Sequence, residues 1–455
     1  MLLKGAIHVY LYIGILLYAI LMLYCQDTFS YYNSVNVLLF FSYAMLLFWS
    51  VGRQEEFYTA ARLWKTVFFY SLVISCLYID LSYHYTDDSF FWDYTDPYNY
   101  FRMDERLINK DMAVWEVPAY LSSRKWGFDD WGACISQMLF LELIPSRFFL
   151  FFSQTIVGTL VAVMMFDGCK KIMQTDYAYM AALSFSTSSF IIYYYCSYRK
   201  ELFMIFIVVA TFWLFYKYVA DNKSSYLVLA GFVSLGMAFY RPAIIILMWA
   251  GMFSYFVAKE WGKKKMIPIM FVLLILVGLS FSFVADTADR YTAGGDLSKN
   301  ENYVGATKFS IMVSSVGVMI GPFPQLLQLG LTKVSQLPLY GSGLLFKFIL
   351  FLAFWNGFVV CLKKRDAVAL PLFVFTVLEM AALAVVNDGL ELRKSLPHLA
   401  TFYMAVFWFL SKYDEQTVKE DKMPALYPAP RVRPKFVLIS LVTLIFLLSL
   451  VWNTR

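Results

Sequence analysis

The chain has 455 residues, of which 60% are hydrophobic, 20% aromatic and only 15% charged, with a formal net charge of +6. A soluble domain of this size must cover a large exterior with polar side chains, so the composition excludes a soluble enzyme, a nucleic-acid-binding protein and a disordered scaffold. The many aromatic residues are typical of chains that meet membrane interfaces repeatedly. The composition therefore predicts an all-α, polytopic integral membrane protein.

Apolar runs of the length that crosses a bilayer as a helix, roughly 20 residues, recur along the whole chain. They predict about 13 transmembrane helices, at 5–25, 33–51, 65–83, 147–166, 177–196, 201–219, 226–240, 243–258, 267–286, 342–362, 367–386, 395–411 and 435–452. The run 131–146 contains Glu142 and ends at Pro145, so we expect it to lie in the membrane interface. The run 311–330 is broken by GPFPQ and predicts a re-entrant or surface-lying segment.

The distribution of basic residues predicts the orientation. With the N-terminus inside, the short inner connections collect Lys and Arg, as in Lys263–Lys265 and in the cytoplasmic loop 412–434. The first apolar run lacks a small-residue cleavage site and is interpreted as an uncleaved span. We therefore expect a single transmembrane domain, 1–455, with a large outer loop carrying interfacial helices at 84–146 and a second outer loop at 287–341.

The outer loops and outer turns carry the candidate chemistry. Residues 84–130 include ten acids, namely Asp87, Asp88, Asp93, Asp96, Asp104, Glu105, Asp111, Glu116, Asp129 and Asp130. Three short outer turns each present an arginine: YRKE at 198–201, YRPA at 240–243 and RKSLPH at 393–398. Arginine at a helix end can bind a phosphate through two hydrogen bonds. It can equally extend to lipid head groups without any catalytic role, and both readings stay open.

Other familiar signatures are missing from the sequence. There is no phosphate-binding GxxxxGK[ST], no GxGxxG, no HExxH and no Cys/His metal spacing, and the three histidines are scattered. Glu379 lies inside a predicted span, where a carboxylate is costly unless it is paired or faces a cavity. It could couple transport to protons or bond to a neighbouring helix. These absences leave membrane-face transferases and transporters as the candidate classes.

The order of these features resembles GT-C-type glycosyltransferases and the related Wzy- and EpsG-like polysaccharide polymerases. An acid followed by aromatics, Asp96 with Tyr100 and Phe101, precedes an amphipathic stretch at 129–144. An Arg-acid turn with Arg199 and Glu201, an Arg-Pro turn with Arg241 and Pro242, and a late Arg and Pro, Arg393 and Pro397, follow in that order. The sequence departs from the family in having two extra spans before the large loop and Arg-Lys-Glu in place of Arg-acid.

The resemblance implies a bacterial inner-membrane glycosyltransferase that uses polyprenyl-(pyro)phosphate-linked sugars to build an O-antigen or capsule polysaccharide. A polymerase and a single-sugar transferase both stay open, with the aromatic outer loops favouring the polymerase. An inverting transfer needs a base near the acceptor hydroxyl, for which Asp96 is the first candidate and Asp88 the reserve. Charge that develops on the departing phosphate needs fixed cations. The candidates are Arg199, Lys200, Arg241, Arg393, Lys394 and His398, with Glu201, Tyr100 and Glu379 in support. No cofactor is evident; a divalent metal could assist, but the sequence contains no dedicated site for one.

The expected partners are the lipid-linked sugar, membrane lipid and either a chain-length regulator or a flippase. The main alternative is that the chain is itself a flippase or a proton-coupled transporter of a lipid-linked oligosaccharide. Transporters often contain internal repeats and mid-membrane polar sites, whereas here the polar residues concentrate in outer loops and no repeat is evident. A scaffold subunit is a third reading, in which Asp96 and Arg199 would both tolerate substitution.

Overall fold

The computed structural model describes residues 58–86, 96–124, 126–127, 130–143, 147–188, 191–192, 194, 199–260, 337–385 and 396–420. Every regular element among these residues is helical, as the composition predicts. Three of the described helices, α7, α10 and α12, are long and apolar enough to cross a membrane. The fold is therefore that of an all-α polytopic membrane protein.

In chain order, the described helices are α3 (Ala60–Thr86), α4 (Asp96–Asn109), α5 (Val117–Ser123), α6 (Trp131–Leu143), α7 (Arg147–Cys169), α8 (Thr175–Ser186), α10 (Glu201–Asp221), α11 (Ser224–Leu235), the 3-10 helix η3 (Gly236–Phe239), α12 (Pro242–Lys259), α16 (Leu337–Lys364), α17 (Leu370–Val385) and α18 (Leu396–Glu420). The expected runs 5–25, 33–51, 267–286, 311–330 and 435–452 lie outside the described residues, as does most of 287–341 and of 412–434.

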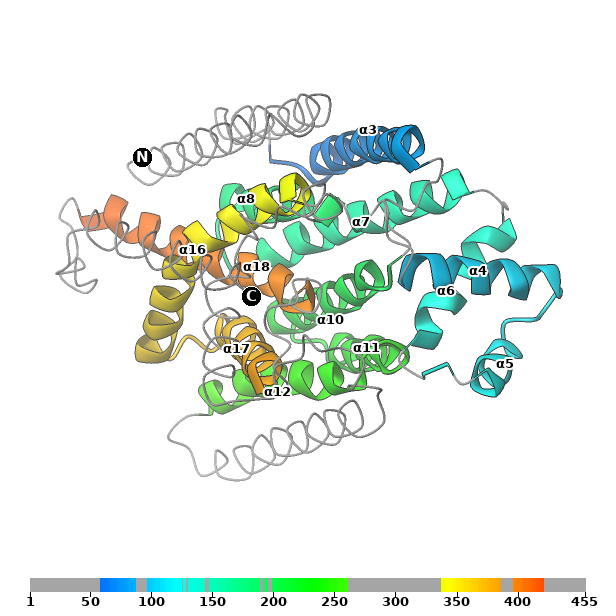
Figure 1. Cartoon of the computed structure of the whole chain (residues 1–455). Helices are drawn as coiled ribbons and strands as arrows, with labels where there is room; N and C mark the ends of the chain where they lie inside the picture. Colours follow the sequence, from blue (N-terminus) through cyan, green and yellow to red (C-terminus); the bar gives the residue numbers. More distant parts are fainter. Residues whose placement is uncertain are drawn as a thin grey trace.

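The long helices form one bundle around a shared apolar core (Figure 1). Helix α10 packs against α7, α11 and α18, while α12 packs against α17. Gly251 of α12 permits the latter contact, since a Cβ atom there would come within 3.0 Å of the Pro371 carbonyl oxygen. Buried aromatic rings fill the space between the helices, as with Phe212 and Phe375, whose ring centroids lie 5.3 Å apart.

Local sequence explains where several helices begin and end. Arg241 has an extended backbone, and Pro242 follows as the first residue of α12, a position that needs no amide hydrogen. Asn222 ends α10 in the left-handed region, with φ of 54°. The Asp366 carboxylate accepts hydrogen bonds from the amides of Val368 and Ala369 just ahead of α17. These are ordinary capping interactions, so the helix ends are encoded locally.

One predicted span is shorter in the structure than in the sequence analysis. The run 177–196 predicted a continuous helix, but α8 ends at Ser186, and its C-cap residue is Thr187. The Thr187 hydroxyl donates to the Leu183 carbonyl oxygen at 2.7 Å. Ser and Thr hydroxyls compete in this way with the helical backbone bonds. The hydroxyl-rich sequence SFSTSS at 184–189 thus coincides with the end of a helix that apolar composition alone would continue.

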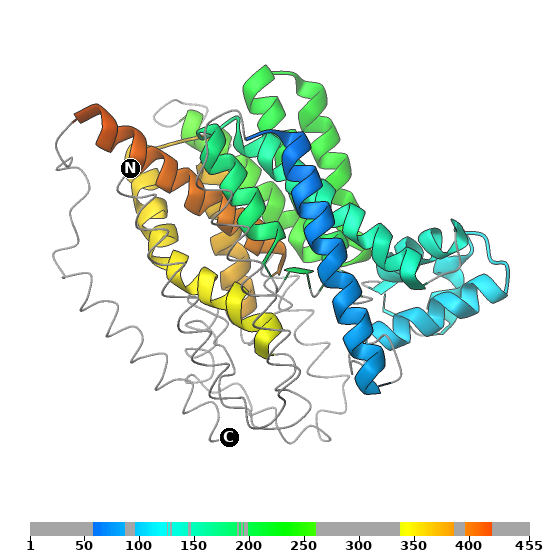
Figure 2. The same cartoon turned by 90° about the horizontal axis from the view of Figure 1, so that it is seen from above.

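The large loop predicted at 84–146 contains three helices with a small core of their own. We call α4, α5 and α6 the α4–α6 unit; both views place it at one end of the bundle (Figures 1 and 2). Its core consists of Tyr100, Met103, Leu107, Val117, Leu121, Ala133, Cys134 and Met138. A second small cluster, Phe101, Leu141 and Leu150, joins α4 to the start of α7. The loop is therefore folded onto the bundle.

Candidate functional site

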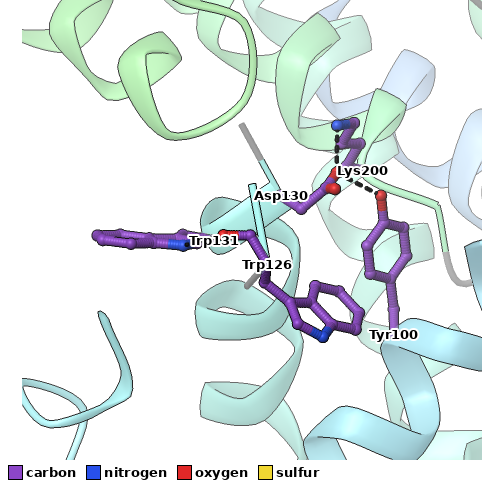
Figure 3. Close-up of polar contacts among 5 residues, drawn as sticks. All are labelled: Tyr100, Trp126, Asp130, Trp131 and Lys200. Carbon is purple, nitrogen blue, oxygen red and sulfur yellow. Dashed lines mark hydrogen bonds and ion pairs between the residues drawn. The ribbon is translucent and has the colours of Figure 1, made fainter. Parts of the chain in front are cut away.

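The central contact of the site joins three segments at Asp130, the residue just before α6. The Lys200 ammonium lies 2.5 Å from Asp130 Oδ1, and the Tyr100 hydroxyl donates to the same oxygen at 2.7 Å (Figure 3). Tyr100 belongs to α4, and Lys200 is the N-cap residue of α10. One carboxylate therefore connects the α4–α6 unit to the first turn of a bundle helix.

Lys200 is part of a buried, charged turn. Arg199, Lys200 and Glu201 have exposed fractions of only 8%, 8% and 2%, and they directly precede the apolar body of α10. Buried charges are costly unless they are paired and hydrogen-bonded. Such charges persist in proteins mainly where they bind a partner, and here one partner of Lys200 is Asp130. The turn predicted from YRKE therefore concentrates charge at a defined place beside α6.

A second predicted turn lies against the same stretch of α6. The Tyr240 hydroxyl donates to the Gly132 carbonyl oxygen at 3.0 Å and lies 3.2 Å from Ser136 Oγ. Tyr240 also stacks on Phe203 of α10, with ring centroids 6.3 Å apart. Arg241 follows Tyr240 and is half-buried. The turns that carry Arg199 and Arg241 are therefore neighbours at the α4–α6 end of the bundle.

A buried acid, Asp104, lies one helical turn after Tyr100 on α4. Asp104 is fully buried, and neither carboxylate oxygen has a nitrogen or oxygen donor within the described part of the chain. Burial raises the pKa of the Asp104 carboxyl well above its usual range; the nearby thiol of Cys134 opposes this in part, and Glu105 adds to it. Tyr100 and Asp104 lie one turn apart on one face of α4. Cys134, in the first turn of α6, follows Asp130 by four residues. Two polar contacts, Tyr100 with Asp130 and Asp104 with Cys134, therefore join α4 to the start of α6.

Aromatic side chains flank the polar contacts. Trp126 lies beside Tyr100, with ring centroids 5.7 Å apart, and the Trp131 ring points away from Asp130 (Figure 3). The Trp131 indole donates to the Trp126 carbonyl oxygen at 3.4 Å. Trp115, between α4 and α5, is 82% exposed. Indole rings are apolar with one polar edge, so they suit either a membrane interface or the face of a sugar ring.

The structure places the other predicted site residues as follows. Asp96 is the first residue of α4, one turn ahead of Tyr100. Asp88, Arg393 and Lys394 lie outside the described residues. Glu379 of α17 and His398 of α18 are both buried, and Glu379 Oε2 lies 3.8 Å from His398 Nδ1. The structure thus groups Tyr100, Lys200, Glu201 and the Arg241 turn at the α4–α6 end, while Glu379 and His398 pair with each other.

Two residues of the site were not singled out by the sequence analysis. Asp104 and Asp130 were included there only among ten acids of a long loop. The available signal for Asp130 was its position directly before the apolar helix 131–143; for Asp104 it was the spacing of four residues from Tyr100. Among the described residues, no three His, Cys, Asp or Glu side chains converge as metal ligands would.

Comparison with known proteins adds one match. A model of the dolichyl-phosphate-mannose-protein mannosyltransferase family, which is of the GT-C type, matches residues 131–284, about a third of the chain. The matched stretch includes α6, α7, α8, α10, α11 and α12, and with them Lys200 and Arg241. No curated protein and no solved structure matches the chain. The match and the membrane-spanning helices together support a membrane glycosyltransferase of the GT-C type.

Proposed function

We propose that the protein transfers sugars from a polyprenyl phosphate or pyrophosphate carrier at the extracytoplasmic membrane face, and that it polymerises a cell-surface polysaccharide. The observation that carries the proposal is the packing of the Arg199–Glu201 turn and the Arg241 turn side by side against α6. Both turns lie beside the α4–α6 unit, which begins at the candidate base, Asp96. The family match supports the lipid-linked donor.

In this mechanism the acid and the cations have separate roles. Asp96, with Asp88 in reserve, takes the proton from the acceptor hydroxyl as that oxygen attacks the anomeric carbon and inverts it. The lipid phosphate leaves with developing negative charge, which fixed cations stabilise without reorganising. Arg199, Lys200 and Arg241 are assigned to this charge, with Arg393 and Lys394 as further candidates. His398, predicted for the same role, lies buried beside Glu379 at the contact between α17 and α18. The lipid tail lies among the helices, which is why the enzyme is embedded in the membrane.

Polymerisation, as opposed to a single transfer, is assigned from the aromatic character of the α4–α6 unit. Trp126 lies beside Tyr100 at the polar contact, the Trp131 ring points away from it, and Trp115, between α4 and α5, is 82% exposed. A growing glycan needs an acceptor surface that holds several sugar rings, and flat aromatic side chains provide one. A chain-length regulator or a flippase is the expected protein partner in such a system.

The proposal is tested by measuring product length in liposomes that contain the purified full chain and polyprenyl-pyrophosphate oligosaccharide. A ladder of products from the wild type, lost in Asp96→Asn, is the expected result. Asp111→Asn is the matched control, because Asp111 is exposed and its φ of 51° is one that Asn adopts readily. A single-step product would retain the transferase and remove the polymerase assignment. Full activity of Asp96→Asn would remove Asp96 from the mechanism.

A proton-coupled carrier or flippase is the second candidate, and the buried Glu379–His398 pair is the observation that favours it. An intramembrane acid next to a histidine is a common arrangement in proton relays. The same liposomes decide between the two functions. Movement of intact lipid-linked sugar across the bilayer, with no change in its length and with loss in Glu379→Gln, would replace the transferase by the carrier.

A further inference from the structure

The Asp130–Lys200 ion pair is unevenly exposed. The Asp130 side chain is 30% exposed, whereas that of Lys200 is 11% exposed. Tyr100, itself buried, donates to the oxygen that Lys200 contacts, so the carboxylate has a second anchor on α4. An anion that approaches Lys200 from outside therefore meets a site whose charge is already neutralised by an acid of the same chain.

We propose that Asp130 is a displaceable counter-ion of Lys200, which weakens the hold of the site on a lipid phosphate and so sets the rate at which the phosphate product leaves. This inference rests on the proposed function, because it takes a phosphate-terminated lipid as the ligand of Lys200. In the empty site Lys200 contacts Asp130. When the lipid phosphate binds, Lys200 turns to a phosphate oxygen while Asp130 keeps its hydrogen bond from Tyr100.

The lipid phosphate and the Asp130 carboxylate compete for one ammonium group. A phosphate gains its contact with Lys200 only by giving up the contact between Lys200 and Asp130, so the net affinity is lower than for an uncompensated lysine. Partly exposed ion pairs contribute little each, which makes this exchange easily reversible. An enzyme that turns over repeatedly needs such reversibility, because tight product binding would limit its rate. Asp130 is in this scheme a positioning residue, since it acts through Lys200.

The substitution Asp130→Asn isolates the charge. The amide keeps the size of the side chain and an oxygen that accepts from Tyr100, but it removes the negative charge opposite Lys200. A merely structural role predicts weaker ligand binding or none in this variant. The counter-ion role predicts the reverse, namely tighter binding of the phosphate with slower turnover.

The experiment measures binding of polyprenyl monophosphate, and of the uncharged polyprenol as reference, to the purified full chain in nanodiscs. We expect the wild type to prefer the phosphate, Asp130→Asn to bind it about three- to tenfold more tightly, and Lys200→Met to show a smaller preference, because Arg199 and Arg241 remain. The double variant is expected to bind like Lys200→Met, because the effect of Asp130 passes through that lysine. Glu105→Gln removes an exposed acid of α4 and is expected to match the wild type.

Several outcomes would overturn the proposal. Unchanged or weaker phosphate binding by Asp130→Asn would do so, as would a gain that persists in the double variant or an equal affinity of the wild type for phosphate and polyprenol. Asp130→Ser, which is smaller, serves as the second charge-removing variant if Asp130→Asn fails to fold, with the same expectation. The binding result is independent of transfer. If Asp130→Asn binds more tightly but the wild type transfers no sugar, the proposed enzyme and the role of Asp130 in product release both fail, and the counter-ion role in phosphate binding stands.

Discussion

Glu379 and His398 face each other across the contact between α17 and α18, with 3.8 Å between Glu379 Oε2 and His398 Nδ1. The same two helices are joined by the hydroxyls of Thr376 and Thr401, 2.8 Å apart, and Thr401 also donates to the His398 carbonyl oxygen. A polar seam therefore runs through an otherwise apolar helix pair. It explains how a carboxylate is accommodated in α17, whose other buried side chains are almost all apolar.

This seam predicts strong coupling between the two side chains. Glu379→Leu or His398→Leu alone leaves a buried polar group facing an apolar one, and each is expected to lower the free energy of unfolding by about 3 kcal/mol. The double variant is expected to lose much less than the sum of the two. Thermal unfolding of the four proteins in one detergent measures the coupling. Strict additivity would mean that the two groups do not interact.

The contact between α6 and the Arg241 turn depends on a glycine. A Cβ atom at Gly132 would lie 2.6 Å from two atoms of the Tyr240 ring and 2.8 Å from the Phe239 carbonyl oxygen. We expect Gly132→Ala to displace the turn and to destabilise the protein by about 1–3 kcal/mol, the usual cost of overpacking. Transfer activity should fall as well, because Arg241 moves with the turn.

Gly231 is the matched control for this prediction. It also lies within a helix, α11, but nothing would lie within 4 Å of an added Cβ atom. Gly231→Ala is therefore expected to leave activity unchanged and to stabilise the protein by up to about 1 kcal/mol through helix propensity alone. Equal effects of the two substitutions on melting temperature would show that the close approach at Gly132 is unimportant.

Much of the fold could be predicted from apolar runs and turn chemistry. The runs at 147–166 and 201–219 correspond to α7 and α10, and the Arg-Pro turn starts α12 where Pro242 predicts it. The end of α8 at Ser186 was missed, because the sequence prediction weighed apolar content and not the competition of hydroxyl groups for backbone carbonyls. Length and composition therefore predict the presence of a helix more accurately than they predict its last residue.

The site could be predicted only in part. The turns at Arg199 and Arg241 were recognised because each departs from its apolar surroundings. Asp130 was not, since its partners Tyr100 and Lys200 lie 30 and 70 residues away along the chain. Nothing in a single sequence links positions so far apart when many acids are available. The contact becomes visible only once α4 and α10 are packed against the start of α6.

The buried Asp104 predicts a dependence of stability on pH. Burial raises the pKa of this carboxyl in the folded protein, so the folded state holds the proton over a range in which the unfolded chain has released it. The contribution of Asp104 to stability is therefore full below its ordinary pKa of about 3.9. It is lost as the pH rises through the raised folded value.

Asp104→Asn removes this titration while keeping the shape of the side chain. The variant is expected to lose less stability than the wild type as the pH is raised from about 5 to about 9, so its melting temperature should gain on that of the wild type along the series. Asp111→Asn, which alters an exposed acid that does not act on the Asp104 carboxyl, should follow the wild type closely. If the melting temperatures of the wild type and Asp104→Asn change in parallel over this pH range, the Asp104 carboxyl does not retain its proton. The contact between Asp104 and Cys134 would then carry a charge.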